Sequence, residues 1–119
     1  MANRELEREV ERALVRGVKA SGGEVRKLAW VGRRGAPDRL VFLPPFSGVP
    51  GVSKNKQTVD PWRMVFVELK TRHGKLSRLQ QIEVRRLRAM GLDVVVLAGH
   101  DDVEKFLRCR RGQGGQQGP

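Results

Sequence analysis

Apolar residues recur along the first twenty positions at the spacing of an α-helix. They form a single stripe that consists of Leu6, Val10, Ala13, Leu14 and Val18. Gly22 and Gly23 follow and favour a stop. The pattern predicts a helix over residues 4–20.

Four later segments have the composition of strands, at residues 24–31, 38–43, 63–70 and 92–99. The continuous apolar run in the third of them indicates burial on both faces, as in the middle of a sheet. Two glycines and a proline at 32–37 predict a turn or loop, and the proline-rich stretch 44–61 predicts a long surface loop.

Two further helices are expected. Ser77 followed by Gln80 is a capping-box pattern for a helix that runs to about Met90, with Gly91 as its left-handed stop. Residues 101–110 predict a short last helix. The order is therefore helix, three strands, helix, strand, helix.

This order predicts an α/β fold with a mixed four-stranded sheet flanked by helices. The helix between the third and fourth strands makes a right-handed crossover, which places those two strands in parallel. The first three strands are joined by turns or loops and are expected to be antiparallel.

Length and charge narrow the class of protein. A chain of 119 residues suits one domain, which we place at 1–111, followed by a flexible tail rich in Gly and Gln at 112–119. The formal net charge of +11 attracts polyanions, with nucleic acid first among them. No apolar run suits a membrane span or a secretory signal, and the single cysteine fits a reducing compartment, so we expect a cytoplasmic protein.

The strand end "VFVELK" carries the candidate chemistry. Glu68 and Lys70 project to one face of the strand while Leu69 faces the other. Taken alone, the pair is most simply a local ion pair. Asp38 directly follows a proline at another strand start, where it is also typical of a turn cap. If the two strands are neighbours, Asp38 and Glu68 can hold a hard divalent cation such as Mg²⁺ or Mn²⁺ beside the lysine, as phosphodiester hydrolysis requires.

These motifs resemble a known family. "PD" at 37–38 with "ELK" at 68–70 is similar to the signature of PD-(D/E)XK nucleases, and "RRGAPDRLVF" with "FVELKTRHGKLSRLQ" resembles the VRR-NUC branch of that superfamily. The resemblance covers most of the chain. It implies a restriction-endonuclease-like core, in agreement with the predicted order of elements.

The resemblance also implies roles for single residues. Asp38, Glu68 and the backbone carbonyl of Leu69 would be metal ligands, and Lys70 the catalytic lysine. The family places a further glutamate on the first helix, which points to Glu11, with Glu7 as the alternative one turn earlier. Gln80 matches a glutamine near the active site that would bind phosphate or metal-bound water, a role compatible with capping the helix.

Basic residues gather on both sides of these positions. Between 70 and 88 seven Lys or Arg stand against one acid, a footprint typical of phosphate contacts. The candidate DNA contacts are Arg33, Arg34, Arg39, Arg72, His73, Lys75 and Arg78, although His73 also reads as a plain turn residue. Aromatic residues are sparse, which favours duplex or structured DNA over single strands.

The leading hypothesis is a Mg²⁺- or Mn²⁺-dependent endonuclease with no small-molecule substrate. Its expected substrate is branched DNA, such as the Holliday junctions of repair and recombination. Size and resemblance suggest a homodimer with paired sites in a bacterial or phage-infected cell. Two alternatives remain, a basic DNA-binding module without turnover and a restriction-type enzyme with base specificity.

Overall fold

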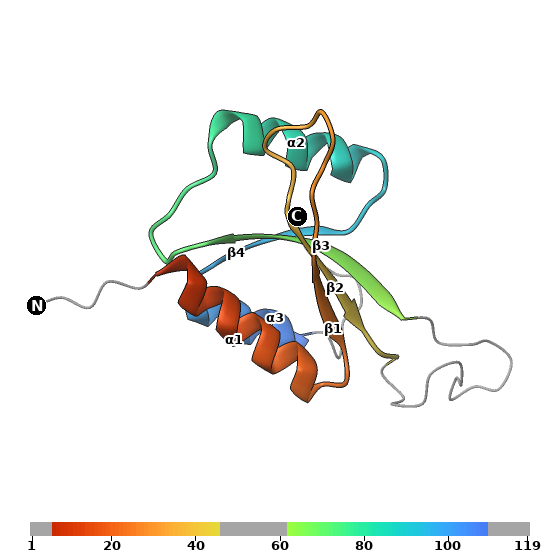
Figure 1. The fold of residues 1–119 in the computed structure, drawn as a ribbon, viewed down its shortest axis with the longest axis vertical. Coiled ribbons are helices and arrows are strands. Elements are labelled where there is room, and N and C mark those ends of the chain that lie inside the picture. The colour runs from red at the N-terminus through yellow and green to blue at the C-terminus, as the bar shows by residue number, and fades with distance from the viewer. Residues whose placement is uncertain (1–5, 46–61, 110–119) are drawn as a thin grey trace, which may run out of the picture.

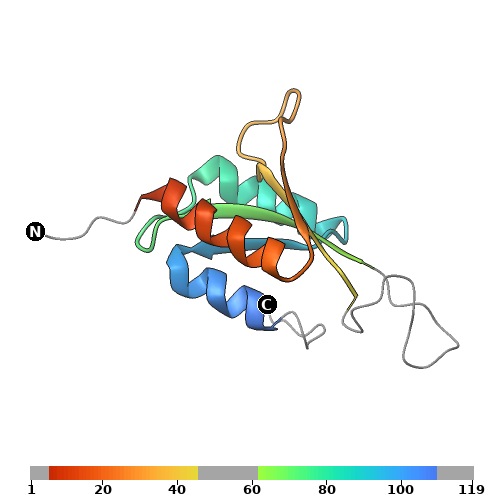
Figure 2. The same ribbon diagram turned by 60° about the horizontal axis from the view of Figure 1, so that its bottom comes forward.

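A four-stranded sheet runs through the middle of the computed structural model, which describes residues 6–45 and 62–109 (Figure 1). The elements in chain order are α1 (Glu7–Ala20), β1 (Glu24–Lys27), β2 (Arg39–Leu43), β3 (Arg63–Lys70), α2 (Arg78–Ala89), β4 (Val94–Ala98) and α3 (Gly99–Cys109). Helices α1 and α3 cover one face of the sheet, and α2 covers the other (Figures 1 and 2). The predicted order of elements is confirmed.

The strands lie in the order β1-β2-β3-β4. The β1–β2 and β2–β3 pairs are antiparallel, whereas β3 and β4 are parallel and joined through α2. The sheet is mixed for the expected reason, since a helical crossover returns the chain in the same direction while the other connections reverse it.

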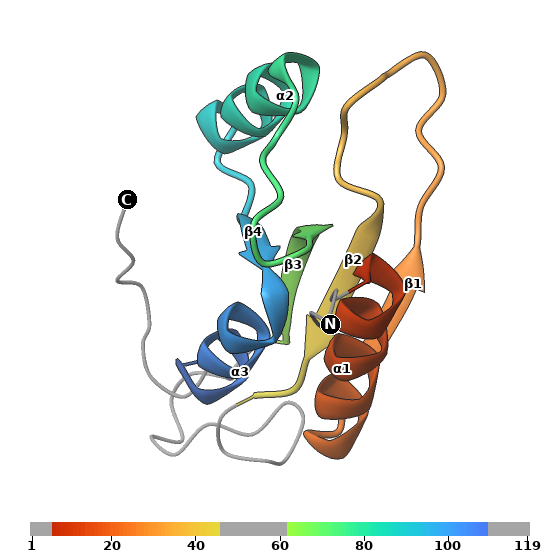
Figure 3. The ribbon, with the colours of Figure 1, turned by 90° about the vertical axis from the view of Figure 1, so that its left-hand side faces the viewer.

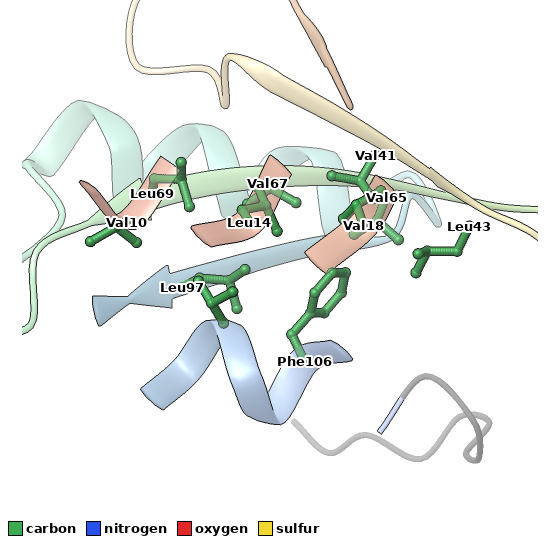
Figure 4. Packing of buried hydrophobic residues seen from close by; sticks show 11 residues of the cluster. Val10, Leu14, Val18, Val41, Leu43, Val65, Val67, Leu69, Leu97 and Phe106 are labelled. Atoms are coloured by element: carbon green, nitrogen blue, oxygen red, sulfur yellow. The ribbon is translucent and has the colours of Figure 1, made fainter. Parts of the chain in front are cut away.

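The main core lies between the sheet and the pair α1 and α3. The stripe on α1 is fully buried at Val10, Leu14 and Val18. It packs against alternate residues of the strands and against the last helix, and Figure 4 shows these partners as Val41, Leu43, Val65, Val67, Leu69, Leu97 and Phe106. Because β3 is buried toward both layers, its central position predicted from the continuous apolar run is confirmed.

A smaller cluster fixes α2 to the opposite face. Val84 and Leu87 of the helix pack with Val94 of β4, and Trp30 and Phe66 extend the contact. The two ring centroids of Trp30 and Phe66 are 5.7 Å apart. This second cluster places the start of α2 above the end of β3, which is where the candidate site lies.

The ends of α2 follow the sequence prediction. Ser77 and Gln80 form both hydrogen bonds of the capping box, and Gly91 has a φ of +86° directly after the helix. The predicted helix start and stop are therefore confirmed.

Several boundaries differ from prediction, and β4 begins at Val94 where residue 92 was expected. The first strand ends at Lys27 instead of continuing to residue 31, because the chain leaves the sheet and rises beside α2 (Figure 3). The indole of Trp30 then donates a hydrogen bond to the carbonyl of Pro37 within this loop. The last helix begins at Gly99, two residues early, where Asp102 accepts a hydrogen bond from the backbone N–H of Ala98.

Some predictions fall outside the described residues. These are the first two residues of the predicted helix at 4–20, most of the loop at 44–61 and the tail at 112–119. The extent of the domain, 1–111, stays a prediction. Within the described ranges, every helix is too short or too polar to cross a bilayer.

Candidate active site

The register of the sheet brings Asp38 opposite Glu68. Arg39 pairs with Val67 in the antiparallel β2–β3 ladder, so one further step sets position 38 against position 68. Directly opposed residues share a face of the sheet, and here it is the face that α2 covers. The negative charge of Asp38 also raises the pKa of Glu68, in keeping with this register.

Glu68 is a carboxylate largely removed from water. It is 7% exposed, and its pKa is raised from 4.5 to about 7, first by burial and next by the negative charge of Asp38. The charges of Lys70 and Arg39 act in the opposite direction but do not cancel the increase. The site therefore holds an acid whose charged form is disfavoured by its surroundings.

Lys70 and Gln80 both contact one oxygen of Glu68. The Nζ atom of Lys70 lies 3.9 Å from Oε2, and Nε2 of Gln80 donates a 2.9 Å hydrogen bond to the same atom. The other end of the Gln80 amide accepts a 2.8 Å hydrogen bond from the backbone N–H of Ser77. One side chain thus caps α2 and holds Glu68. Contact of Gln80 with phosphate or metal-bound water stays a prediction.

The loop before β2 positions Asp38. Its carbonyl accepts a 2.9 Å hydrogen bond from the N–H of Leu28, and Trp30 donates at 2.7 Å to the carbonyl of the preceding Pro37. Gly35 has a φ of +84°, and a Cβ there would lie 2.8 Å from backbone atoms of Leu79 at the start of α2. Sequence reasoning missed the roles of Trp30 and Gly35, because neither the hydrogen bond to Pro37 nor the contact with Leu79 follows from the local sequence pattern.

Arg39 does not lie on the surface, where a phosphate contact was expected. It is 6% exposed and is bonded to the carboxylates of Glu11 and Asp38. This burial corrects its assignment as a DNA contact. Glu11 is thereby engaged with Arg39, whereas Glu7 is the acid of α1 whose charge raises the pKa of Glu68. The structure thus gives Glu11 a partner other than the proposed metal position.

The other candidate DNA contacts are exposed. They are Arg33, Arg34, Arg72, His73, Lys75 and Arg78. They lie in the loop before Asp38, in the turn after Lys70 and at the first residue of α2. Arg33 also approaches the buried Glu83 of α2, with Nη1 at 3.8 Å from Oε1. The exposed cations therefore flank the two carboxylates on the α2 side of the sheet.

The chemistry of the donors suits a hard divalent cation. Among residues 6–45 and 62–109, no three His, Cys, Asp or Glu side chains gather as a metal site. Two carboxylates nevertheless suffice for Mg²⁺, which commonly keeps several waters and uses one or two protein carboxylates together with substrate phosphate. Asp38 and the dehydrated Glu68 provide such a pair. The side chain of Leu69 packs in the main core. The role of its backbone carbonyl as a metal ligand stays a prediction.

Comparison with known proteins agrees with the resemblance seen in the sequence. No family model matches the chain. A protein of Acyrthosiphon pisum secondary endosymbiont phage 1, "Putative nuclease p44", is 37% identical over 92 residues, which are 77% of this chain and 82% of the relative. A solved structure described as a VRR_NUC domain matches with a TM-score of 0.65 and 34% identity, over 86% of this chain and 94% of the other.

The layered sheet and the two opposed acids define an α/β fold of the restriction-endonuclease type. With these similarities, the chain belongs to the VRR-NUC branch of the PD-(D/E)XK superfamily. The family resemblance and the fold expected from the sequence are both confirmed.

The raised pKa of Glu68 predicts a pH-dependent gain in stability for Glu68→Gln. At low pH the wild-type carboxyl is protonated whether folded or unfolded, and stability falls as pH rises from 4.5 to about 7, because the folded carboxyl resists ionisation. In EDTA, we expect the neutral variant to have a free energy of unfolding higher by up to about 3 kcal/mol at about pH 8, and little changed at about pH 4.5.

Urea denaturation across this pH range measures the difference. Glu104→Gln on α3, an exposed position, is the control and should show no such trend. A difference between Glu68→Gln and wild type that is the same at both pH values would contradict the assignment of Glu68 as a dehydrated acid.

Proposed function

We propose that the protein is a Mg²⁺- or Mn²⁺-dependent endonuclease that hydrolyses DNA phosphodiester bonds. The observation that carries the proposal is the convergence of Asp38 with the buried Glu68, with Lys70 on the same face. A structural ion pair would account for Glu68 and Lys70 but not for a second carboxylate that makes the first harder to ionise. Membership of the VRR-NUC family supports the same activity.

Each residue has a distinct part in this reaction. Asp38 and Glu68 would hold the cation, which when bound offsets negative charge developing on the phosphoryl oxygens. Lys70 would orient the attacking water or stabilise the same charge through its ammonium group. Gln80 donates to Glu68 and so fixes the orientation of that carboxylate. The exposed cations beside the site would position the DNA backbone.

Branched DNA, such as a Holliday junction, is the proposed substrate, and we place the protein in repair or recombination in the cytoplasm of a bacterial or phage-infected cell. The exposed basic residues flank the site without a row of aromatic side chains, which suits backbone recognition of duplex arms. The phage source of one relative, itself named as a nuclease, fits this setting.

Cleavage tests the assignment directly. We expect wild type with Mg²⁺ or Mn²⁺ to cut four-way junctions faster than flapped or linear duplexes at low salt. Asp38→Asn and Lys70→Met should each reduce the rate about 100-fold or more, because each removes charge that acts on the transition state. Asp93→Asn breaks an exposed pair with Arg63 and serves as the control with full activity.

Other outcomes identify the alternatives. Tight DNA binding without cleavage under either metal would indicate a binding module and refute the enzyme. Discrete fragments from plain duplex would instead indicate a restriction-type specificity.

The basic surface makes a second prediction. Lys75→Ala and Arg78→Ala should each weaken junction binding in EDTA and lower the slope of log K against log salt by about 0.9, the loss expected for one phosphate contact. Lys105→Ala changes an exposed lysine on α3, on the opposite face, and should leave the slope unchanged. Equal effects at all three positions would show that only net charge matters.

A homodimer is part of the proposal, because a two-fold assembly would present paired sites to the two strands of a junction. Sedimentation velocity should give the mass of two chains, or of two chains on one junction. Monomers alone, both free and on junction DNA, would refute this part without affecting the chemistry.

A further inference from the structure

A guanidinium bridge joins α1 to the start of β2. The Nε and Nη2 atoms of Arg39 both lie 2.8 Å from Oε2 of Glu11. On its other side, Nη1 lies 2.7 Å from Oδ1 of Asp38 and 3.4 Å from the backbone carbonyl of the same residue. The mechanism above gives this buried arginine no part.

We propose that Arg39 is a positioning residue, which holds the Asp38 carboxylate toward Glu68 and is itself anchored by Glu11. The inference rests on the proposed function, because it assumes that Asp38 binds the metal. It also gives Glu11 a role through Arg39 instead of a direct bond to the cation.

The geometry requires the planar fork of an arginine. One nitrogen contacts both the side chain and the main chain of Asp38, which fixes the carboxylate relative to its own backbone. The remaining nitrogens are held by Glu11. Lysine keeps the charge but has a single nitrogen at the end of a flexible stem, so it cannot reproduce the fork across two carboxylates.

Asp38 needs such a restraint. Its side chain is 54% exposed, and the β2–β3 register sets it opposite Glu68, a second carboxyl group. Repulsion and solvation both favour rotation of Asp38 away from Glu68. A contact to Oδ1 opposes this rotation and leaves the second oxygen of Asp38 available to a cation.

Three other roles for Arg39 make different predictions. If it were only a nearby positive charge, its removal would tighten cation binding, and lysine would behave as wild type. If it only stabilised the fold, the melting temperature would fall while metal affinity held. If it contacted DNA, affinity for DNA without metal would fall together with its salt slope.

The test compares Arg39→Lys, Arg39→Gln and Glu11→Gln with wild type, well below their melting temperatures. Mn²⁺ affinity is measured by calorimetry without DNA, and junction affinity is measured in EDTA. Arg63→Lys is the matched control, because Arg63 forms a similar fork with Asp93 through contacts of 2.8 and 3.3 Å. Asp38→Asn defines which part of the Mn²⁺ binding belongs to the site.

We expect both Arg39 variants to weaken Mn²⁺ binding about 10- to 100-fold, the usual effect of losing a group that orients a metal ligand. Glu11→Gln should weaken it less, and Arg63→Lys should not change it. Junction affinity in EDTA should stay within about threefold for all variants, because a buried guanidinium offers no phosphate contact. The rate of cleavage at saturating DNA should fall with metal affinity.

The inference is overturned if Arg39→Lys binds Mn²⁺ as wild type does, or if Arg39→Gln binds it more tightly. These results would leave the nuclease assignment intact, provided that Asp38→Asn abolishes binding. If wild type itself shows no Mn²⁺ binding that depends on Asp38, the metal-dependent function fails and the inference fails with it.

Discussion

Repulsion between two carboxylates, one of them kept from water, is the constraint on which the rest of the site depends. Asp38 and Glu68 are brought together by the β2–β3 register, and the environment of Glu68 raises its pKa to about 7. The surrounding groups offset parts of this unfavourable arrangement: Gln80 donates to Glu68, Lys70 supplies positive charge, and Arg39 holds Asp38. This arrangement of charges is compatible with the proposed role of Asp38 and Glu68 as ligands of a divalent cation.

Most of the fold could be predicted from the chain because local patterns and tertiary packing agree. The stripe on α1, the continuous apolar run of β3 and the Ser77–Gln80 cap each specify an element that the structure contains. The first strand was predicted too long for a tertiary reason. Tryptophan is common in strands, but the indole of Trp30 donates a hydrogen bond to the carbonyl of Pro37, and its ring packs on Phe66. Neither contact follows from the pattern of strand-forming residues around Trp30.

Some residues of the site could be predicted from the sequence, and others could not. The positions of Asp38 and Glu68 followed from two short motifs at neighbouring strands, since register turns spacing into contact. The burial of Arg39 did not follow, because an arginine between an aspartate and a leucine reads as a surface residue. The burial of Arg39 becomes apparent only in the folded structure, where Glu11 of α1 forms an ion pair with it. The sequence shows that residue 35 is a glycine in a loop. Its close contact with Leu79 becomes apparent only once α2 is placed.

The double use of the Gln80 amide restricts what evolution can place there. A glutamate would cap the first turn equally well and would interact more favourably with the helix dipole. It would also set a third negative charge against Oε2 of Glu68, where the amide now donates a hydrogen bond. A neutral side chain with a donor at one end and an acceptor at the other meets both demands. The N-terminal cap of α2 and the orientation of the Glu68 carboxylate therefore depend on one and the same side chain.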